Sequence, residues 1–365
     1  MRPDHAASRK GHDAMYDEMR PAGRRSWGGT SRPDGAGRRR RLRVLVATVL
    51  AVAAGAVLPG AAGAASGRLS SGDFTGPAGT QHYELFVPAR HRGRARGRVP
   101  LVVALHGCTQ SADTFRQLSR WDALAKAKRF IVVFPEQDPK DNFFRCWNFF
   151  LPADMHRGSG EPARIAGLTR SVARRYRVDP RRIYVAGMSA GGAMASVMGA
   201  TYPDLFAAIG VGSGCEYAAT ATCAGFRSAD PATAARQAYA EMGARARPMP
   251  FIAFQGDADT TVPPVNADQL VQQWLTTDDL ADDGRLDRSV APVPAKSAVG
   301  SSAGGRSYTV RTYLDKSRRN LAEYWLVHGM AHAWSGGNPA VPYSDASGPD
   351  ETGEMYAFFS RHRRS

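Results

Sequence analysis

The sequence predicts an α/β protein with a mostly parallel sheet that helices cover on both faces. Short apolar runs rich in β-branched residues alternate with longer helix-like segments, and no internal repeat interrupts the alternation. Strands that alternate with helices are joined by right-handed crossovers, which make neighbouring strands parallel. The strand-like runs lie at residues 83–87, 101–105, 131–134, 183–186, 206–211, 251–254 and 321–327. The helix-like segments lie at residues 112–127, 162–176, 190–200, 266–275 and 350–361.

One long polar segment, residues 282–306, is rich in Gly, Ser and Pro and is expected to be a surface excursion. The segments "SYTVRTYLD" (307–315) and "LAEYWLVHG" (321–329) follow it and flank a polar turn, which predicts a hairpin.

The first 64 residues differ from the rest and predict a secretory signal peptide. Residues 1–43 are polar and end in a run of arginines, residues 44–57 are uninterruptedly apolar, and Ala62-Gly63-Ala64 follows as a cleavage site. A membrane anchor is the alternative, but the apolar run is shorter than the roughly 20 residues that a spanning helix needs. Both general and twin-arginine export remain open. We therefore expect a secreted, extracellular protein, with 1–64 as N-terminal extension and signal peptide and 65–365 as a single domain.

The charge of the chain is basic without pointing to a nucleic acid. The chain has 48 basic and 33 acidic side chains, of which the first 64 residues hold 12 and 5, so a net charge of +8 remains after cleavage. The basic loop 89–98 has no interleaved aromatic residues and no binding motif around it, and is expected to be a solvated turn. We expect no nucleic-acid partner and no stable membrane partner.

Four cysteines, all beyond residue 64, predict two disulfides because an exported chain is oxidised. Three connectivities are possible. The short separation of Cys215 and Cys223 makes that pair plausible and leaves Cys108 with Cys146. A metal site is not expected, since no C-x-x-C pair and no H-E-x-x-H helix is present.

The segment "YVAGMSAGGAMAS" (184–196) places Ser189 in a Gly-x-Ser-x-Gly pattern between a strand and a helix. This is the setting of the nucleophile elbow of serine hydrolases, in which small neighbours permit a sharp turn. Glycines are also common at ordinary turns, so the pattern alone is not decisive.

A serine nucleophile needs a base and an orienting acid, which should follow it in the order acid, then histidine, on loops after strands. "QGDADTTVPP" supplies Asp259, with Asp257 as its rival nearer the strand end. "VHGMAHAWSGG" supplies His332 on the loop after the last strand, whereas His328 still belongs to the strand end.

The oxyanion hole needs two backbone N–H donors. Ala190 follows the nucleophile, and "LHGCTQ" after an early strand allows the N–H of Cys108 to turn inward beside Gly107. His106 is expected to position this loop and is assigned to the substrate-binding residues. Trp147 and Trp334, and Phe149 and Phe150 with them, are candidates for an apolar pocket wall; ordinary core packing is the alternative.

Several motifs in order resemble the esterase family of polyhydroxybutyrate depolymerases. They are "VALHGCTQSADTF", "FPEQ", "RCWNFF", "GMSAGGAMASVMGATYPDLFA", "GDADTTVPPVNADQL" and "EYWLVHGMAHAWSGG", and the likeness covers about residues 80–362. The resemblance implies an α/β-hydrolase fold, Ser189, Asp259 and His332 as a triad, and Cys108 at the oxyanion loop. It also favours Asp259 over Asp257. One departure is visible: such families usually have Gly-His-x-Trp, whereas here Ala331 precedes His332. Alanine is small enough to keep the loop.

The expected function is hydrolysis of ester bonds in poly(3-hydroxybutyrate) or its oligomers, without a cofactor. A feruloyl or acetylxylan esterase with the same triad is the alternative, and a peptidase or a non-catalytic secreted binding module is more remote. The chain ends just after its final helix, so no separate substrate-binding module is expected. The sequence leaves the oligomeric state open.

Overall fold

A computed structural model of the chain describes residues 67–89, 97–220, 223–226 and 230–364. The expected signal peptide, and all of the basic loop except its ends, lie outside the described residues. Among the described helices, none is both long and apolar enough to cross a membrane.

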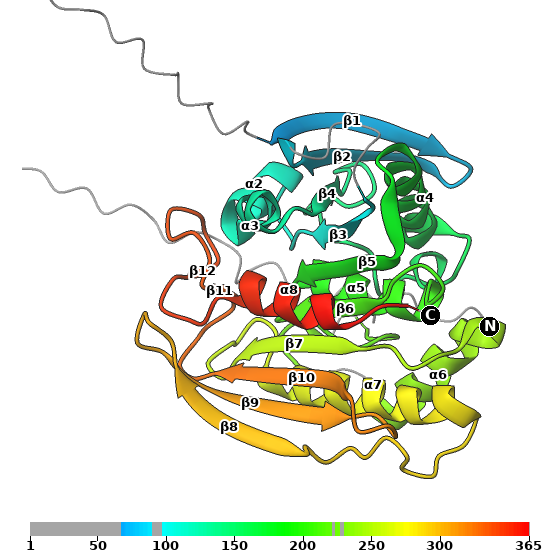
Figure 1. Ribbon diagram of the computed structural model, residues 1–365, viewed down its shortest axis with the longest axis vertical. Helices are drawn as coiled ribbons and strands as arrows, with labels where there is room; N and C mark the ends of the chain where they lie inside the picture. The colour runs from blue at the N-terminus through cyan, green and yellow to red at the C-terminus, as the bar shows by residue number, and fades with distance from the viewer. Residues whose placement is uncertain (1–66, 90–96, 221–222, 227–229, 365) are drawn as a thin grey trace, which may run out of the picture. The chain divides into compact units, whose positions relative to one another are not determined.

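Ten described strands form one sheet in the order β1-β2-β4-β3-β5-β6-β7-β10-β9-β8 (Figure 1). The six strands from β4 to β10 run parallel to their neighbours, and antiparallel strands are added at both edges. The mostly parallel sheet predicted from the sequence is therefore confirmed. The strands are β1 (Arg68–Gly76), β2 (Gly79–Val87), β3 (Val99–Leu105), β4 (Ile131–Glu136), β5 (Val178–Met188), β6 (Ala208–Gly212), β7 (Phe251–Gly256), β8 (Lys296–Ser301), β9 (Ser307–Leu314) and β10 (Asn320–Val327).

Two helical layers cover the two faces of this sheet. One layer consists of α4 (Gly160–Arg175), α5 (Ala190–Thr201), α6 (Pro231–Met242) and α7 (Pro264–Asp283). The other consists of α2 (Ala112–Ser119), α3 (Trp121–Lys128) and α8 (Glu351–Arg361). A short pair of strands, β11 (Trp334–Ser335) and β12 (Ser344–Asp345), lies outside the main sheet. Two short 3₁₀ helices, η2 (Pro152–Asp154) and η4 (Gly243–Arg245), complete the described elements.

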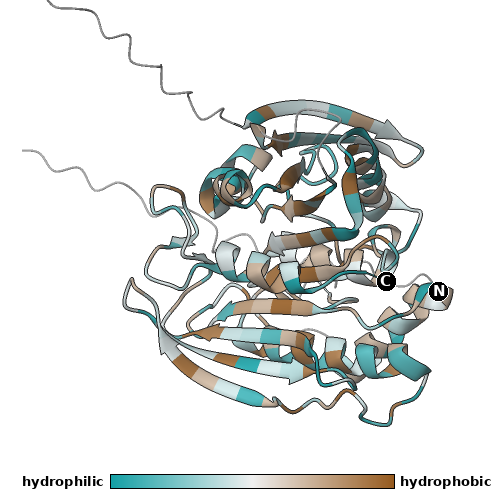
Figure 2. Ribbon diagram, viewed as in Figure 1, coloured by the Kyte–Doolittle hydropathy of each residue, from teal (hydrophilic) through white to brown (hydrophobic). Residues whose placement is uncertain are grey.

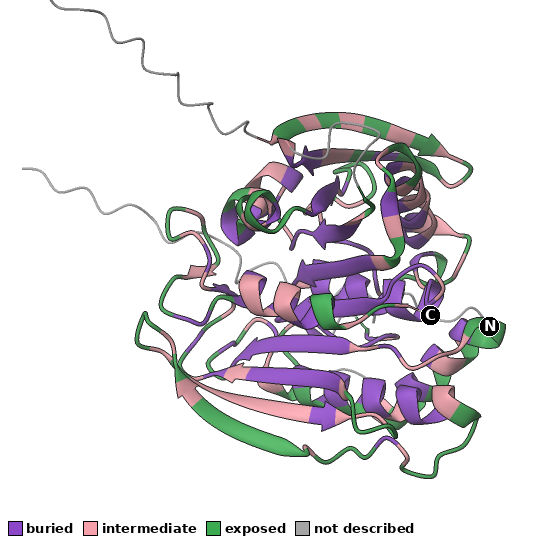
Figure 3. Ribbon diagram, in the orientation of Figure 1, coloured by how far each residue is buried: buried purple, intermediate pink, exposed green. Residues whose placement is uncertain are grey.

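The central strands are apolar on both sides, as a doubly covered sheet requires. In β3, Leu101, Val103 and Leu105 face the α4–α7 layer, whereas Val102 and Ala104 face the opposite layer. Figure 2 shows hydrophobic residues along the central strands, and Figure 3 shows that these strands are buried while β8 is largely exposed. The core thus lies on both faces of the sheet.

Strand β3 lies between β4 and β5, although β4 follows it in the chain. The chain runs from β3 outward to β4 on one side of it, and then returns past β3 to β5 on the other side. The loops after β3 and β5 therefore separate at one point of the sheet edge. In open α/β sheets, ligands bind at such a switch point, outside the carboxyl ends of the strands.

The predicted helix over 112–127 is wrong in one respect, because the structure breaks it at Arg120. Arg120 has a left-handed backbone with φ 56°, and its N–H caps α2 by donating to the carbonyl of Arg116. The carbonyls of Leu118 and Ser119 accept hydrogen bonds from Asn338 and Thr352, which lie more than 200 residues away. These hydrogen bonds engage the carbonyls at the end of α2, and the apolar pattern of residues 112–127 does not reveal them.

Apart from the short elements β11, β12, η2 and η4, three elements were not expected. β1 pairs in full register with β2 but has few β-branched residues, and β8 lies inside the segment expected to be an irregular excursion. α6 buries mainly alanines, which form a narrow apolar face, and Asp230 caps it by accepting from the Thr233 N–H. The hairpin of β9 and β10 was predicted and is confirmed.

Candidate active site

Ser189 lies in a strained turn between β5 and α5. Its backbone has φ 57° and ψ −125°, which a non-glycine residue adopts only where the surrounding structure enforces it. The Ser189 N–H donates to the Gly212 carbonyl at 2.8 Å, which ties the turn to the end of β6. The side chain of Ser189 is partly exposed, whereas Met188 and Ala190 on either side are buried. This is the geometry of a nucleophile elbow.

Two glycines allow the elbow to approach the neighbouring strand. A Cβ at Gly187 would overlap the carbonyl of Gly191, and a Cβ at Gly191 would overlap the carbonyls of Leu105 and His106. The start of α5 therefore packs directly against the backbone at the end of β3. This contact brings the loop after β3 to the nucleophile.

Gly107, in that loop, lies next to the serine. A Cβ at Gly107 would lie 3.3 Å from Ser189 Cβ and 3.4 Å from the Met188 carbonyl oxygen. The Gly107 N–H donates to Gln110 Oε1 at 2.9 Å, which fixes the turn. Within the described part of the chain, the N–H groups of Cys108 and Ala190 donate to no other residue. These two donors, predicted from the sequence as the oxyanion hole, are thus uncommitted.

His332 and Asp259 meet after β10 and β7, which are parallel neighbours in the sheet. His332 Nδ1 lies 2.8 Å from Asp259 Oδ2, and the carboxylate is completely buried. Asp259 Oδ1 accepts from the N–H groups of Thr261 and Val262 at 2.9 and 2.8 Å, and Oδ2 also accepts from Gln255 Nε2. The carboxylate is therefore held in one orientation, and it presents Oδ2 to the imidazole.

The rival pair, Asp257 and His328, is arranged differently. Asp257 Oδ2 lies 2.8 Å from His328 Nδ1, and Oδ1 accepts from the Gly329 N–H. Partial burial acts to raise the pKa of Asp257, but hydrogen bonds from His328 and Gly329 outweigh it, and the pKa is lowered. Thr309 Oγ1 occupies the other nitrogen, His328 Nε2, at 3.0 Å. Because both nitrogens of His328 are engaged, His328 is poorly suited to exchange a proton with a serine, which favours His332.

The loops that carry the acid and the base are joined by backbone contacts. The Ala258 N–H donates to the Met330 carbonyl at 3.1 Å, and a Cβ at Gly256 would overlap the same carbonyl. Ala331 is exposed between them, so the departure from glycine noted in the sequence meets no crowding.

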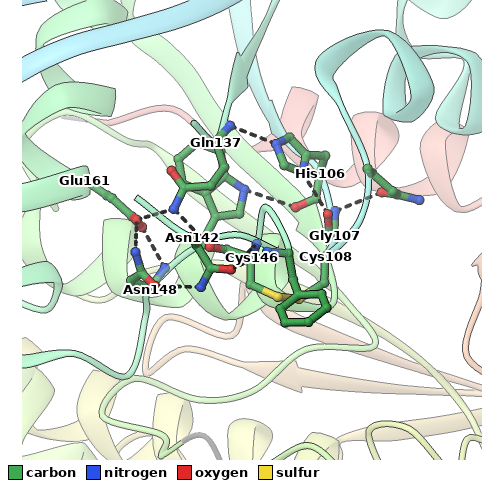
Figure 4. The surroundings of a disulfide bond; sticks show 11 residues. His106, Gly107, Cys108, Gln137, Asn142, Cys146, Asn148 and Glu161 are labelled. Atoms are coloured by element: carbon green, nitrogen blue, oxygen red, sulfur yellow. Dashed lines mark hydrogen bonds between the residues drawn. A yellow bond between two sulfur atoms is a disulfide. The ribbon is translucent and has the colours of Figure 1, made fainter. Parts of the chain in front are cut away.

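Both expected disulfides are present and confirm the predicted pairing. Cys108 is bonded to Cys146, and Cys215 is bonded to Cys223. The first bond ties the loop after β3 to the loop after β4 (Figure 4).

His106 is completely buried and acts on the loop from inside the protein. Its Nδ1 lies 2.8 Å from the Gly107 carbonyl and must donate, so Nε2 accepts from the Gln137 N–H at 3.0 Å. Burial is the main reason that the pKa of His106 falls to about 4. The ring is therefore neutral at physiological pH, with a fixed tautomer. This arrangement agrees with the expected positioning role.

The same burial argues against direct substrate contact by His106, Trp147 and Trp334, which the sequence interpretation assigned to substrate binding. Trp147 is fully buried and its Nε1 donates to the His106 carbonyl at 3.0 Å. Trp334 is fully buried against Phe115, and its Nε1 donates to Thr352 Oγ1. Both indoles have their N–H groups satisfied inside the core, so we reassign all three side chains to the support of the site.

Sequence reasoning missed a polar cluster beneath the loop, in which every member except the partly exposed Asn142 is buried. It consists of Gln137, Asn142, Asn148 and Glu161, which surround the disulfide (Figure 4). Gln137 and Asn148 lie within two of the quoted motifs, "FPEQ" and "RCWNFF", so polar residues beside Cys146 were a usable signal. Glu161 follows a glycine at a helix start and has no motif of its own.

The arrangement can perform nucleophilic acyl transfer. It has a serine on a strained elbow, an imidazole oriented by a buried carboxylate, and two uncommitted N–H donors, one of Ala190 directly after the serine and one of Cys108 directly after Gly107. No group of three or more His, Cys, Asp or Glu side chains in the described residues is arranged to hold a metal ion.

Comparisons with known proteins agree with this chemistry. The model of the family "Esterase PHB depolymerase" matches residues 81–291. Poly(3-hydroxyalkanoate) depolymerase C of Paucimonas lemoignei is 34% identical over 258 residues, which are 68% of this chain and 57% of that protein. Acetylxylan esterase A of Aspergillus oryzae is 34% identical over 191 residues, which are 48% of this chain and 60% of that protein. The chain thus spans less than two thirds of the length of either relative.

Among solved structures, an acetyl xylan esterase from Aspergillus awamori superposes with a TM-score of 0.62 at 22% identity. The superposition covers 80% of this chain and 100% of that one. The likeness confirms the α/β-hydrolase fold expected from the sequence.

Proposed function

We propose, from the premise that this chain belongs to the esterase PHB depolymerase family, that it is a serine carboxylic-ester hydrolase with Ser189, His332 and Asp259 as its triad. The observation that carries the proposal is the buried Asp259 carboxylate, which two backbone N–H groups orient toward His332 Nδ1. This leaves His332 Nε2 as the nitrogen that exchanges protons.

The catalytic cycle follows from these positions. His332 Nε2 takes the hydroxyl proton of Ser189 as its Oγ attacks the ester carbonyl carbon, and Asp259 stabilises the imidazolium. The N–H groups of Ala190 and Cys108 bind the oxyanion of the tetrahedral intermediate. His332 then gives the proton to the departing alcohol, which leaves an acyl-enzyme. Water attacks the acyl-enzyme with the same proton transfers in reverse order and releases the acid and free Ser189.

The substrate that we propose is poly(3-hydroxybutyrate) or its oligomers. The supporting similarity is the 34% identity to the P. lemoignei poly(3-hydroxyalkanoate) depolymerase over 68% of this chain. Each cleavage consumes one water and gives one product with a new carboxyl group and one with a new hydroxyl group, without oxidation or reduction, so the reaction needs no cofactor.

Acetylxylan or feruloyl ester hydrolysis is the second candidate. The A. oryzae acetylxylan esterase is equally identical, although over a shorter segment. The same triad and oxyanion donors serve either substrate, because only the acyl and alcohol groups differ.

We also propose that residues 1–64 are removed on export, that residues 65–365 form the catalytic domain, and that the mature protein is extracellular. The two disulfides support this location, since such bonds persist in oxidising compartments.

The test is a side-by-side assay of the purified protein on amorphous poly(3-hydroxybutyrate), soluble hydroxybutyrate oligomers, acetylated xylan and methyl ferulate, with Ser189→Ala as control. Release of 3-hydroxybutyrate that Ser189→Ala abolishes supports the depolymerase. Release of acetate or ferulate alone would show that the substrates are plant-wall esters. Two further assays cover the remote alternatives. Turnover of a peptide substrate without turnover of any ester would indicate a peptidase, and no turnover together with no labelling of Ser189 by an organophosphonate would indicate a binding module.

A further inference from the structure

The buried carboxylate of Glu161 is connected by hydrogen bonds, through Gln137 and His106, to the backbone of the oxyanion loop. Glu161, in the first turn of α4, is 1% exposed. Its Oε1 accepts from Gln137 Nε2 and from Asn148 Nδ2 at 2.5 and 2.7 Å, and its Oε2 accepts from the Asn148 N–H at 2.8 Å. Three donors therefore converge on one carboxylate inside the core.

Gln137 connects this carboxylate to both sides of the loop after β3. Its side-chain amide donates to Glu161 and to the Cys146 carbonyl, and its backbone N–H donates to His106 Nε2. His106 in turn donates to the carbonyl of Gly107. Cys146 is bonded to Cys108, so both branches reach the Gly107–Cys108 peptide, which contains the proposed oxyanion donor (Figure 4).

We propose that Glu161 is a positioning residue for the oxyanion hole, acting through Gln137 to hold the Cys108 N–H toward the reacting carbonyl. This inference rests on the proposed function and extends it beyond the triad. Glu161 does not touch the substrate. An anionic acceptor is suited to the role because its hydrogen bonds are stronger than those of a neutral group, and because it can satisfy three donors at once.

The geometry requires the ionised form for full effect. Both oxygens of Glu161 accept hydrogen bonds. In a protonated carboxyl group, or in the amide of glutamine, one of these two positions carries hydrogen and faces the donors of Gln137 or Asn148, so at least one of the bonds is lost. Burial, followed by the negative charge of Asp154, raises the pKa of Glu161 to about 8, against the lowering effect of the hydrogen bonds from the Asn148 N–H and the Gln137 side chain and of the Arg164 charge. Asp154 also accepts from the Glu161 N–H, and Arg164 pairs with Asp141.

The test is Glu161→Gln, which keeps the size of the side chain and removes the anionic acceptor. At about pH 9, where Glu161 of the wild type is ionised, we expect kcat on a soluble ester to fall about 10- to 100-fold, because small displacements of a catalytic donor have effects of this size. KM should change by no more than about twofold, since the oxyanion forms only after binding. The difference in kcat should shrink at about pH 6.5, where the wild type is itself protonated.

A matched control is Asp278→Asn in α7. Asp278 is also a fully buried carboxyl group that accepts one backbone N–H, from Met249, but Met249 precedes the N-terminal end of β7, whereas Ser189 follows the C-terminal end of β5. This control should lose stability without a selective loss of kcat. If Glu161→Gln does not fold, Gln137→Met removes the side-chain amide that links Glu161 to the Cys146 carbonyl and is expected to lower kcat in the same way.

Affinity for a trifluoromethyl ketone, which forms a tetrahedral adduct with the serine, provides a readout that a merely structural role would not change. It should weaken in Glu161→Gln in proportion to kcat/KM, while inhibition by the product acid stays constant. If Glu161→Gln has the same kcat as the wild type at about pH 9 and Ser189→Ala is inactive, the positioning role of Glu161 is wrong and the proposed function still stands. Absence of ester hydrolysis in the wild type would instead overturn the proposed function.

Discussion

His332 Nδ1 lies 2.8 Å from Asp259 Oδ2, and the carboxylate that holds it is fully buried and accepts two further backbone N–H groups. A second pair in the same two loops, His328 and Asp257, has the same Nδ1–Oδ2 distance, but Thr309 occupies its free nitrogen. The two pairs therefore differ in whether the imidazole can still transfer a proton.

Asp259→Asn should abolish most activity while the fold is kept. An asparagine at this position favours the wrong imidazole tautomer, and we expect kcat to fall about 10⁴-fold. Steady-state kinetics on a soluble ester measure the effect. Asp257→Asn is the matched control and should retain kcat within about threefold, because its histidine is not the proposed base. A large loss in the Asp257 variant alone would exchange the roles of the two pairs.

Removal of the Cys108–Cys146 disulfide should affect activity and stability together. The bond closes a separation of 38 residues, and the loop-entropy relation gives a stabilisation of about 4 kcal/mol. The Cys215–Cys223 bond closes 8 residues and corresponds to about 2.5 kcal/mol by the same relation. We expect Cys108→Ala/Cys146→Ala to lower kcat as well as stability, because the bond restrains the oxyanion loop. Denaturant unfolding and kinetics of the two double variants separate these effects. Equal kcat losses in both would remove the special role of the first bond.

Gly256→Ala should displace the loop that carries the base. The added Cβ would overlap the Met330 carbonyl, a backbone atom that cannot rotate away, so we expect a destabilisation of about 1–3 kcal/mol and a lower kcat. Thermal unfolding and kinetics provide the measurement. Gly97→Ala is the control, since no atom lies within 4 Å of its Cβ position. Unchanged kcat in folded Gly256→Ala would show that this contact does not position His332.

The pH dependence of stability should contain two opposing contributions from the support of the oxyanion loop. The pKa of Glu161 is raised from 4.5 to about 8, so from pH 4.5 to about 8 the native state holds a proton that the unfolded chain releases. The free energy of unfolding then falls with rising pH, by up to about 1.4 kcal/mol per unit. The pKa of His106 is lowered from 6.5 to about 4, so its contribution is complete above pH 6.5 and is lost as the pH falls toward 4.

Urea unfolding of the wild type and Glu161→Gln between pH 5 and pH 9 tests this prediction. The free energy of unfolding of the wild type, relative to that of Glu161→Gln, should fall as the pH rises through this range, because only in the wild type does unfolding release a proton from residue 161. A constant difference between the two proteins would show that Glu161 has an ordinary pKa in the native state.

The sequence predicted those parts of the molecule that local patterns determine. The alternation of apolar runs with helical segments identified the parallel strands, and the Gly-x-Ser-x-Gly pattern placed Ser189 on a turn that the structure shows to be strained. The cysteine count and spacing led to the correct disulfide pairing. The assignment of the triad itself stays a prediction, supported by the contact of His332 with Asp259.

Other features depend on residues far apart in the chain. The break at Arg120 depends on carbonyl contacts with Asn338 and Thr352, and no periodicity in residues 112–127 reveals them. The burial of Trp147 and Trp334 depends on which face of the loop meets the core, since an aromatic near a site can either line it or support it. Glu161 could not be placed, because a single acidic residue at a helix start is ordinarily solvated.

The most direct measurement of the central claim is mass spectrometry of the protein after reaction with a fluorophosphonate. We predict one phosphonyl group on the peptide that contains Ser189, formed in step with loss of ester hydrolysis, and no adduct in Ser189→Ala or in His332→Ala over the same time. Ester hydrolysis that continues in the fully labelled protein, or labelling of a different residue in step with inactivation, would contradict the assignment of Ser189 as the nucleophile.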